Sequence, residues 1–333
     1  MLTKREVVST QKIYLPTLTT KTSKEIENIQ PEIKVLLVGD VMLGRKVMLE
    51  SQKKKDFVYP FRKVASTLST SDIVFINLEN PMVKDCPYTY AGFKFCSPPE
   101  SAEGLVSAGV DVVNLANNHS MNYGQAGINE TLEILGDKEI LATGLGELKV
   151  LEKQGTSFGF LGFDFTVKEP IAADYEQIKN ADEQVDILIV GVHWGVEYTD
   201  KPTVSQRLWA KKMVEAGADV ISGHHPHWVQ GVDCIAEDGS ASYIAANDFK
   251  RGSVCQESTV PIFYSLGNFI FDQMWSEETK KGAIVELTFS SKGGSASGRK
   301  GGTLQGRVPS GTRQGMKTFR TYIRNWGQVE FVD

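Results

Sequence analysis

Residues 187–195 read Ile-Leu-Ile-Val-Gly-Val-His-Trp-Gly, an apolar run that ends in a histidine. A short continuous run of this kind predicts a strand buried on both faces, as in a parallel sheet. His193 would then lie at the carboxyl edge of that sheet. Two other apolar runs end in the same way: residues 110–115 lead into Ala-Asn-Asn-His at 116–119, and residues 220–222 lead into Gly-His-His-Pro-His at 223–227.

All five histidines of the chain lie in these three motifs. Two carboxylates follow predicted strands in the same manner, Asp40 after residues 35–38 and Glu79 after residues 73–76. One such residue alone is usually a cap, a turn residue or a packed histidine. Five strand ends that all carry metal-ligand types of side chain indicate a metal site at the carboxyl edge of a sheet.

Strands and helices alternate along the chain, which predicts a layered α/β fold. We expect strands at 34–39, 72–77, 111–116, 140–143, 157–163, 187–193, 219–222, 261–265 and 283–289, and helices at 60–68, 101–108, 124–135 and 203–215. The polar segment 237–259 is expected to form a long loop, and segment 319–332 to add one strand. The predicted organisation is an N-terminal arm (1–31), a main domain (32–290) and a basic, glycine-rich tail (291–333).

The composition is that of a soluble globular protein, with 41% hydrophobic residues and a formal net charge of −5. That charge does not indicate a nucleic-acid-binding surface. We find no apolar run of about 18 residues, so we expect no transmembrane helix, and the N-terminus lacks the apolar centre of a signal peptide. A soluble protein, in the cytoplasm or associated with the cell envelope, is expected.

The four cysteines, Cys86, Cys96, Cys234 and Cys255, show no Cys-x-x-Cys spacing. A zinc cage is therefore not expected. Four free thiols are the expectation for a chain without a visible export signal. In an exported protein, the pairs Cys86–Cys96 and Cys234–Cys255 would be sterically plausible disulfides.

The candidate metal ligands combine carboxylate, amide and imidazole groups: Asp40, Glu79, Asn118, His193, His225 and His227. This mixture suits Zn²⁺, Mn²⁺ or Fe²⁺ better than Ca²⁺ or Mg²⁺, which prefer oxygen ligands alone. Six ligands are too many for one tetrahedral ion. They predict two divalent ions that share a bridging carboxylate and a hydroxide.

Six motifs that occur in order between Lys34 and Phe289 resemble the CapA family of capsule and poly-γ-glutamate synthesis proteins, relatives of the calcineurin-like metallophosphoesterases. The motifs are GDVMLGR (39–45), NLENP (77–81), LANNH (115–119), HWGVEY (193–198), GHHPH (223–227) and YSLGNF (264–269). The resemblance implies a four-layer αββα sandwich with Glu79 as the bridging ligand. Met42 stands where the phosphoesterases have a histidine, and the extra His224 leaves the register of the GHHPH motif open.

The resemblance also implies a function. His119 would be a proton donor, and Arg45 and Asn268 are candidates for holding an oxyanion. We expect a metal-dependent, phosphoesterase-like hydrolase of bacterial capsule or poly-γ-glutamate biosynthesis, in which a hydroxide shared by two metal ions attacks a phosphoester or a γ-glutamyl polymer. The alternative is a non-catalytic subunit that binds the anionic polymer beside other capsule synthesis or export proteins, and Met42 favours it.

Overall fold

Two β-sheets form the centre of the computed structural model, which describes residues 31–249, 255–291 and 313–332. Within these residues the first sheet has eight strands and the second has seven. The first follows the order β15 (Gln328–Val332), β14 (Arg313–Arg324), β13 (Lys281–Ser290), β1 (Glu32–Val41), β2 (Ile73–Leu78), β3 (Val112–Asn114) and β4 (Leu141–Thr143), with β12 (Asn268–Ile270) also paired to β1.

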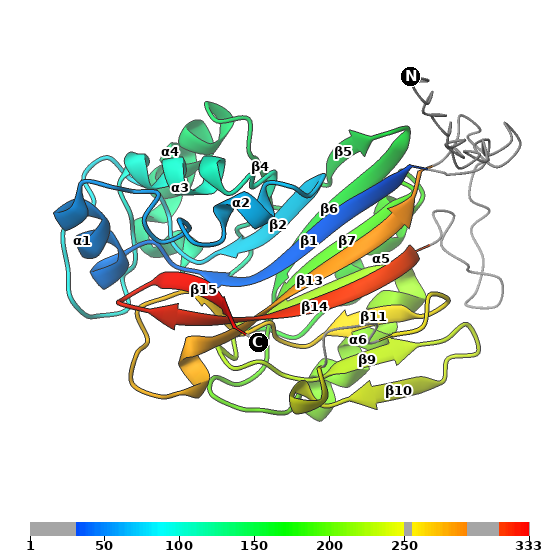
Figure 1. Cartoon of the computed structure of the whole chain (residues 1–333). Helices are drawn as coiled ribbons and strands as arrows, with labels where there is room; N and C mark the ends of the chain where they lie inside the picture. The colour runs from blue at the N-terminus through cyan, green and yellow to red at the C-terminus, as the bar shows by residue number, and fades with distance from the viewer. Residues whose placement is uncertain (1–30, 250–254, 292–312, 333) are drawn as a thin grey trace, which may run out of the picture. The chain divides into compact units, whose positions relative to one another are not determined.

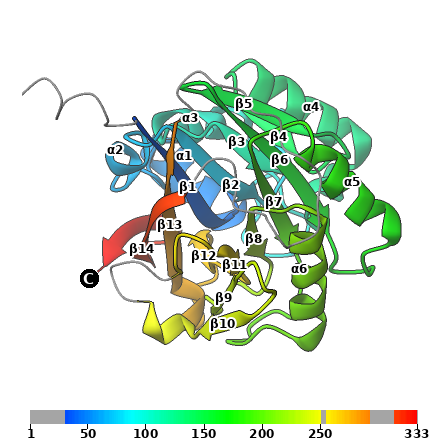
Figure 2. The ribbon, with the colours of Figure 1, turned by 90° about the vertical axis from the view of Figure 1, so that its right-hand side faces the viewer.

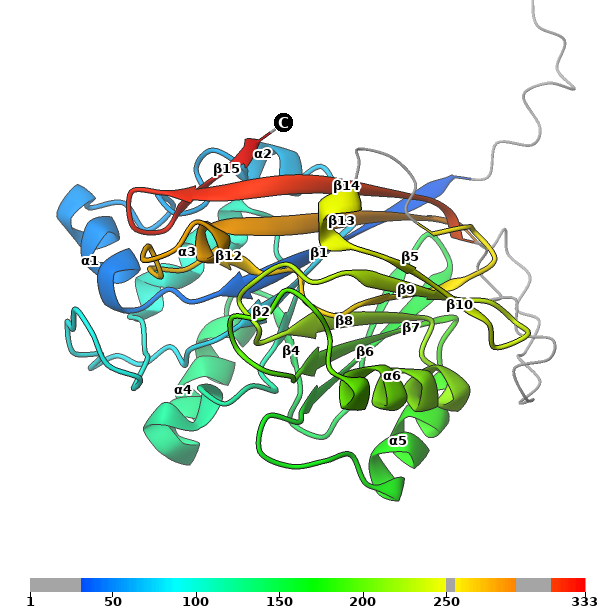
Figure 3. The same cartoon turned by 90° about the horizontal axis from the view of Figure 1, so that it is seen from below.

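The second sheet contains β7 (Ile187–His193), the apolar strand that ends in His193, near its middle. The order is β10 (Ala241–Ile244), β9 (Val232–Ile235), β11 (Val260–Phe263), β8 (Val220–His224), β7, β6 (Thr156–Asp164) and β5 (Lys149–Lys153). Strands β6, β7, β8 and β11 are parallel neighbours. In Figure 3, β13 and β14 run beside β1 in one layer, and β7 and β8 lie in the other.

The residues of β1 show why the two sheets stack. Ile33, Val35 and Leu37 alternate along the strand and pack into a core that also contains residues of the second sheet, such as Phe158. Leu36 and the other side chains of opposite orientation pack into a separate core with the helices of the first sheet. Because successive side chains of a strand point to opposite faces, an apolar run buries both faces at once.

Helices cover the outer face of each sheet. Residues of α1 (Arg45–Lys54), α2 (Ala65–Leu68), α3 (Ala102–Ser107) and α4 (Gly124–Gly136) pack on the first sheet, and those of α5 (Ala172–Asp182) and α6 (Val204–Ala216) pack on the second. Figure 2 shows α5 and α6 side by side along that sheet. The predicted four-layer αββα sandwich is confirmed (Figure 1). None of the described helices has the length and apolar character needed to cross a bilayer.

The C-terminal segment differs from its prediction. Residues 313–324 and 328–332 form two strands, not one, and β14 pairs with β13 over most of its length. Phe319 and Ile323 pack on the core of the first sheet. The part of the expected tail from residue 313 onward is therefore part of the fold, whereas residues 292–312 and nearly all of the expected arm lie outside the described residues.

Several local predictions also need correction. Residues 45–54 form α1, which was not predicted. Most of its residues are polar, and Val47 and Met48 are its only buried apolar side chains, so the sequence lacks a clear apolar face. Of the helix expected at 60–68, only residues 65–68 are helical. The loop expected at 237–259 contains β10, which pairs with β9.

The expectation of four free thiols is wrong, since the structure contains the disulfides Cys86–Cys96 and Cys234–Cys255. The Cα–Cα distances are 5.8 and 5.6 Å, within the usual range for disulfides. The first closes a loop between β2 and α3, and the second connects β9 to the segment that precedes β11. A disulfide pair of this kind is typical of proteins that fold in an oxidising compartment.

Candidate metal centre

Asp40 lies near the end of β1 and its side chain is completely buried. Its Oδ1 accepts a hydrogen bond from Nδ2 of Asn77 at 3.0 Å and lies 2.9 Å from Nδ1 of His224. Its Oδ2 lies 3.2 Å from Nδ1 of His227 and accepts a bond from the backbone N–H of His225 at 3.3 Å. Burial alone would raise the pKa of Asp40, but the hydrogen bonds from His224 and His227 hold it well below its usual range.

Glu79 follows the last residue of β2, and its position is fixed by a backbone hydrogen bond to Val41 (2.8 Å). Its carboxylate is completely buried, yet neither oxygen has a hydrogen-bond partner. Oε1 lies 3.9, 3.9 and 3.8 Å from Nε2 of His119, His193 and His227, too far for hydrogen bonds. Burial raises the pKa of Glu79 well above its usual value. A carboxylate without partners is costly to bury, and a bound cation would supply the missing partner.

His227 completes a cluster with Asp40 and Glu79 in which one ligand atom of each residue lies within 4.8 Å of the others. All three residues are buried. Burial alone would lower the pKa of His227, but the charges of Glu79 and Asp40 raise it to about 9. An imidazole that holds a proton so firmly beside two carboxylates marks a position where a cation is favoured. The donor set and the unpartnered oxygens of Glu79 therefore fit a divalent metal ion.

The other predicted ligands lie beside this cluster. Nε2 of His193, at the end of β7, lies 3.1 Å from Oδ1 of the exposed Asn118. The ring of His225 lies 4.8 Å from that of His193, and its buried Nδ1 has no partner. Burial and the nearby His227 lower the pKa of His225 to about 4, so this imidazole is neutral at pH 7. A neutral ring is the form in which histidine binds metals.

Four residues around the same cluster have a strained backbone. His225 and His227 have φ values of 97° and 58°, and Arg45 and Tyr198 have values of 46° and 59°. Residues other than glycine rarely adopt this left-handed region, at a cost of about 1–3 kcal/mol each. Strain of this kind persists where the surroundings hold it, and it is typical of functional sites.

His119 faces Glu79 through Nε2, while its Nδ1 lies 3.2 Å from Oδ1 of Asn122. Phe95 stacks on its ring at a centroid distance of 3.9 Å. Burial lowers the pKa of His119 below its usual value. This side chain therefore lies where a proton donor or acceptor could reach a ligand held near Glu79.

Arg45 contacts three other groups of the protein. Its NH2 pairs with Asp272, its NH1 donates to the carbonyl of Gly92 at 2.9 Å, and its guanidinium lies 4.4 Å from the ring centre of Phe95. Of its nitrogens only the buried Nε has no partner. The structure thus places Arg45 against the loop that contains Phe95, where it holds protein groups.

Asn268 is similarly engaged. Its Oδ1 lies 3.0 Å from Nδ1 of His227, and its Nδ2 donates to Oε1 of Gln273 at 3.1 Å and to the carbonyl of Thr279 at 2.9 Å. With both ends of its amide used in this way, Asn268 orients His227.

The structure places two residues whose roles the sequence left open. His224 points at Asp40, and Met42 is completely buried in the core of the first sheet, where its Sδ accepts a bond from the backbone N–H of Gly44 at 3.1 Å. Sequence reasoning missed Asn77, which connects Asp40 to the neighbourhood of His193. Its only signal was its position two residues before Glu79, in the motif NLENP.

Comparison with known proteins agrees with this fold. Residues 34–273 match the model of the family described as bacterial capsule synthesis protein PGA_cap. The chain is 33% identical over 291 residues to the capsule biosynthesis protein CapA of Bacillus anthracis, an alignment that covers 79% of this chain and 65% of the relative. It is 32% identical over 281 residues to the PGA biosynthesis protein CapA of Bacillus subtilis (strain 168), covering 77% and 67%. The chain thus spans about two thirds of these relatives.

Two solved structures share the fold at low identity. A hypothetical protein from Thermus thermophilus superposes with a TM-score of 0.51 at 14% identity, covering 88% of this chain and 100% of that one. A phosphatase from Mycoplasma pneumoniae gives a TM-score of 0.51 at 15% identity, covering 88% and 94%. With a family match over 34–273 and two relatives above 30% identity, the chain belongs to the bacterial capsule synthesis protein (PGA_cap) family.

Proposed function

We propose that this protein is a metal-dependent hydrolase that cleaves a phosphoester. The observation that carries the proposal is the buried Glu79 carboxylate, which has no hydrogen-bond partner and lies 3.8–3.9 Å from three imidazole nitrogens. A bound metal ion would be a partner for this carboxylate, which has none within the protein. The phosphatase-like fold and the neighbouring Asp40 support the same reading.

The residues that would hold metal are Asp40, Glu79 and His227, joined by His193, His225 and Asn118. This set suits two ions of the Mn²⁺, Zn²⁺ or Fe²⁺ type. When bound, such ions supply positive charge that stabilises the charge developing on a phosphoryl group and lower the pKa of water. His224 and Asn77 orient Asp40, and Asn268 orients His227.

His119 would transfer a proton to or from the substrate. Its Nε2 faces Glu79, and it can donate a proton there to a leaving group or accept one from an attacking group. Asn118 is exposed, so it lies where a substrate can reach the site from solvent. Arg45 and Asn268 act in this proposal by holding neighbouring groups, because their side chains are already bonded within the protein.

The substrate would come from capsule biosynthesis. The names of the Bacillus relatives refer to capsule and PGA biosynthesis, so a phosphoester formed on that route, or the γ-glutamyl polymer itself, are the substrates to test. The two disulfides favour action in an oxidising compartment such as the cell envelope. A non-catalytic polymer-binding subunit is the second candidate. Met42 favours it, because this buried methionine stands where the phosphoesterases have a histidine.

Metal content and turnover together test the proposal. Purified protein would be assayed for bound transition metal by elemental mass spectrometry and for hydrolysis of bis(p-nitrophenyl) phosphate, alongside Glu79→Gln and His119→Ala. We expect Glu79→Gln to lose metal, and His119→Ala to keep metal but lose about 10²- to 10⁴-fold in turnover. The exposed Gln125→Ala serves as control. Metal bound without hydrolysis of any phosphoester or γ-glutamyl polymer would favour the binding subunit, and absence of metal would reject both.

A further inference from the structure

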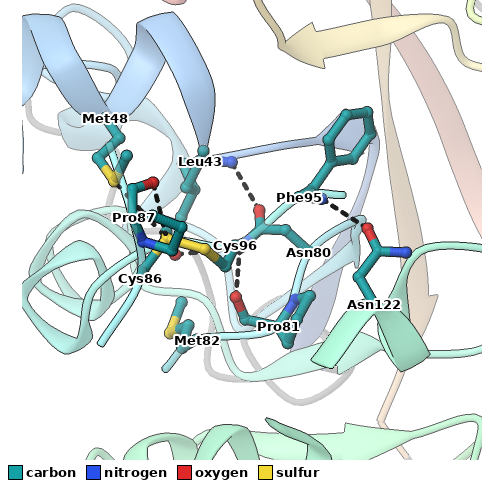
Figure 4. The surroundings of a disulfide bond; sticks show 12 residues. Leu43, Met48, Asn80, Pro81, Met82, Cys86, Pro87, Phe95, Cys96 and Asn122 are labelled. Atoms are coloured by element: carbon teal, nitrogen blue, oxygen red, sulfur yellow. Dashed lines mark hydrogen bonds between the residues drawn. A yellow bond between two sulfur atoms is a disulfide. The ribbon is translucent and has the colours of Figure 1, made fainter. Parts of the chain in front are cut away.

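Asn122 connects His119 to the loop closed by the Cys86–Cys96 disulfide. Its Oδ1 accepts a hydrogen bond from the backbone N–H of Phe95 at 2.6 Å (Figure 4). The same oxygen lies 3.2 Å from Nδ1 of His119. Asn122 comes from the 3₁₀ turn Ser120–Tyr123 that precedes α4, and Phe95 directly precedes Cys96.

These two contacts determine which nitrogen of His119 carries the proton. A backbone N–H can only donate, so the atom of Asn122 that faces Phe95 is the carbonyl oxygen. That oxygen can only accept, so Nδ1 of His119 carries a hydrogen in both charge states of the ring. In the neutral ring the lone pair therefore lies on Nε2, the atom that faces Glu79.

Stacking fixes the orientation of the ring. Phe95 and His119 are stacked at 3.9 Å with an angle of 27° between their planes. Arg45 lies against the same Phe95 ring, at 4.4 Å from its centre. A half-turn of the His119 ring about its Cβ–Cγ bond would keep this stack but place a carbon atom where Nδ1 lies, and the bond to Asn122 would be lost.

The disulfide directly follows Phe95, whose side chain is buried in the core of the first sheet. At its stem the loop is joined by hydrogen bonds from Val83 to Ser97 (2.9 Å) and from Ser97 to Pro81 (3.0 Å). Residues 87–94 have almost no buried side chains, and Tyr90 and Phe93 are 71% and 81% exposed. Between residues 87 and 94 the loop therefore has little packing of its own. It is held at its ends by the disulfide, the stem hydrogen bonds and the buried Phe95, and between them by the bond from Arg45 to the carbonyl of Gly92.

We propose that Asn122 is a positioning residue that fixes the tautomer of His119, and that the Cys86–Cys96 loop holds Asn122 in this role through the backbone of Phe95. The inference rests on the proposed function only for its consequence in catalysis. With Nδ1 always protonated, Nε2 alone accepts and releases the transferred proton. Without Asn122, part of the neutral population would carry its hydrogen on Nε2 and could not accept a proton there.

The tautomer can be measured without substrate or metal. ¹⁵N NMR of the histidine side chains in metal-free protein at pH 8 distinguishes protonated from unprotonated ring nitrogens, and the chain has five histidines, so His119→Gln assigns the signal. We expect the Nδ1–H form in the wild type and in Asn122→Asp, which keeps the acceptor, and a mixture in Asn122→Ala. An Nε2–H ring in the wild type, or an unchanged Nδ1–H form in Asn122→Ala, would overturn the proposal.

Turnover supplies the second readout. On bis(p-nitrophenyl) phosphate, Asn122→Ala should lower kcat about tenfold with little change in KM, because a positioned acid or base contributes about 10²–10⁴-fold, and Asn122→Asp should recover most of the loss. If the wild type hydrolyses nothing, the proposed function fails, while the NMR result still decides the role of Asn122.

The two disulfides provide a matched pair for the role of the loop. Cys86→Ser with Cys96→Ser should give a mixed tautomer and a lower kcat. Cys234→Ser with Cys255→Ser, which removes the disulfide attached to β9, should change neither. Equal effects of the two double variants, or none from the first, would contradict the role assigned to the loop.

Discussion

Asn268 and Asp40 are register partners on the parallel strands β12 and β1, and the side-chain oxygens of both reach the same atom, Nδ1 of His227, at 3.0 and 3.2 Å. Two acceptors at Nδ1 keep a hydrogen on that nitrogen. Nε2, which faces Glu79 at 3.8 Å, is then the atom left to bind a metal. Metal-bound histidines usually donate their other N–H to such a partner, which fixes the ring.

Asn268→Ala should therefore weaken metal binding without removing any ligand. Loss of an outer partner of this kind typically lowers metal affinity about 10- to 100-fold, and calorimetric titration of the metal-free protein with Mn²⁺ or Zn²⁺ would measure it. Asn129→Ala, at an exposed position on α4, should leave the affinity unchanged. An Asn268→Ala protein with wild-type affinity would show that Asp40 alone orients His227.

The metal-free protein should lose stability as the pH rises from 6.5 to 9. Burial alone would lower the pKa of His227, but Glu79 and Asp40 raise it from 6.5 to about 9. Between these values the folded state binds more protons than the unfolded state, so the free energy of unfolding falls with increasing pH. The loss is up to about 3 kcal/mol, and denaturant titrations in EDTA at several pH values would measure it.

His227→Gln is the control for this pH dependence, because its metal-free form should lose the part of the dependence that His227 contributes. Glu79, whose pKa burial also raises, adds a contribution of the same sign. Burial lowers the pKa of His225 to about 4, so this residue changes the free energy of unfolding only at pH below 6.5. Stability of the metal-free wild type that rises between pH 6.5 and 9 would contradict the electrostatics described for the cluster.

Reduction of the disulfides should lower the thermal midpoint. The loops span sequence separations of 10 and 21 residues, so each bond contributes about 3 kcal/mol by the loop-entropy relation. For a domain of this size that corresponds to roughly 5 °C for each bond. Scanning calorimetry with and without reductant, with thiol counting by mass spectrometry, would test this, and four reactive thiols in the untreated protein would contradict the structure.

Much of the sandwich could be predicted from the sequence because its central strands are short apolar runs. The site could be predicted in outline for a related reason: Asp40, Glu79 and His193 each lie at or just after a strand end, and the parallel strand pairs within each sheet bring those ends together. A strand with both faces buried leaves a local signal in the sequence. A polar residue at the end of such an apolar run is easy to recognise in the sequence.

The remainder depends on contacts between distant segments. Arg45 pairs with Asp272, 227 positions away, and no local pattern distinguishes this from an arginine that binds substrate. Helix α1 was missed because most of its residues are polar, and it is held by the burial of Val47 and Met48. Strand β14, which contains Phe319 and Ile323, follows a glycine-rich basic stretch. Its extended conformation depends on pairing with β13.

The close approach of β1 and β12 gives a further prediction, at Gly39. A Cβ placed there would lie 2.2 Å from the carbonyl oxygen of Gly267, the group that accepts the backbone N–H of Asp40 at 2.9 Å. Gly39→Ala must push the two strands apart, which moves Asn268 away from Asp40 and His227. We expect a loss of about 1–3 kcal/mol in stability, as for overpacked cores, together with weaker metal binding.

Gly136→Ala is the matched control, because a Cβ at this position at the end of α4 meets no atom within 4 Å. It should be neutral or stabilise the protein by up to about 1 kcal/mol, with unchanged metal affinity. Chemical denaturation and metal titration of both variants separate the two effects. If Gly39→Ala lost stability yet bound metal as tightly as the wild type, the spacing of β1 and β12 would matter for packing alone, and the orientation of His227 by Asn268 would not depend on it.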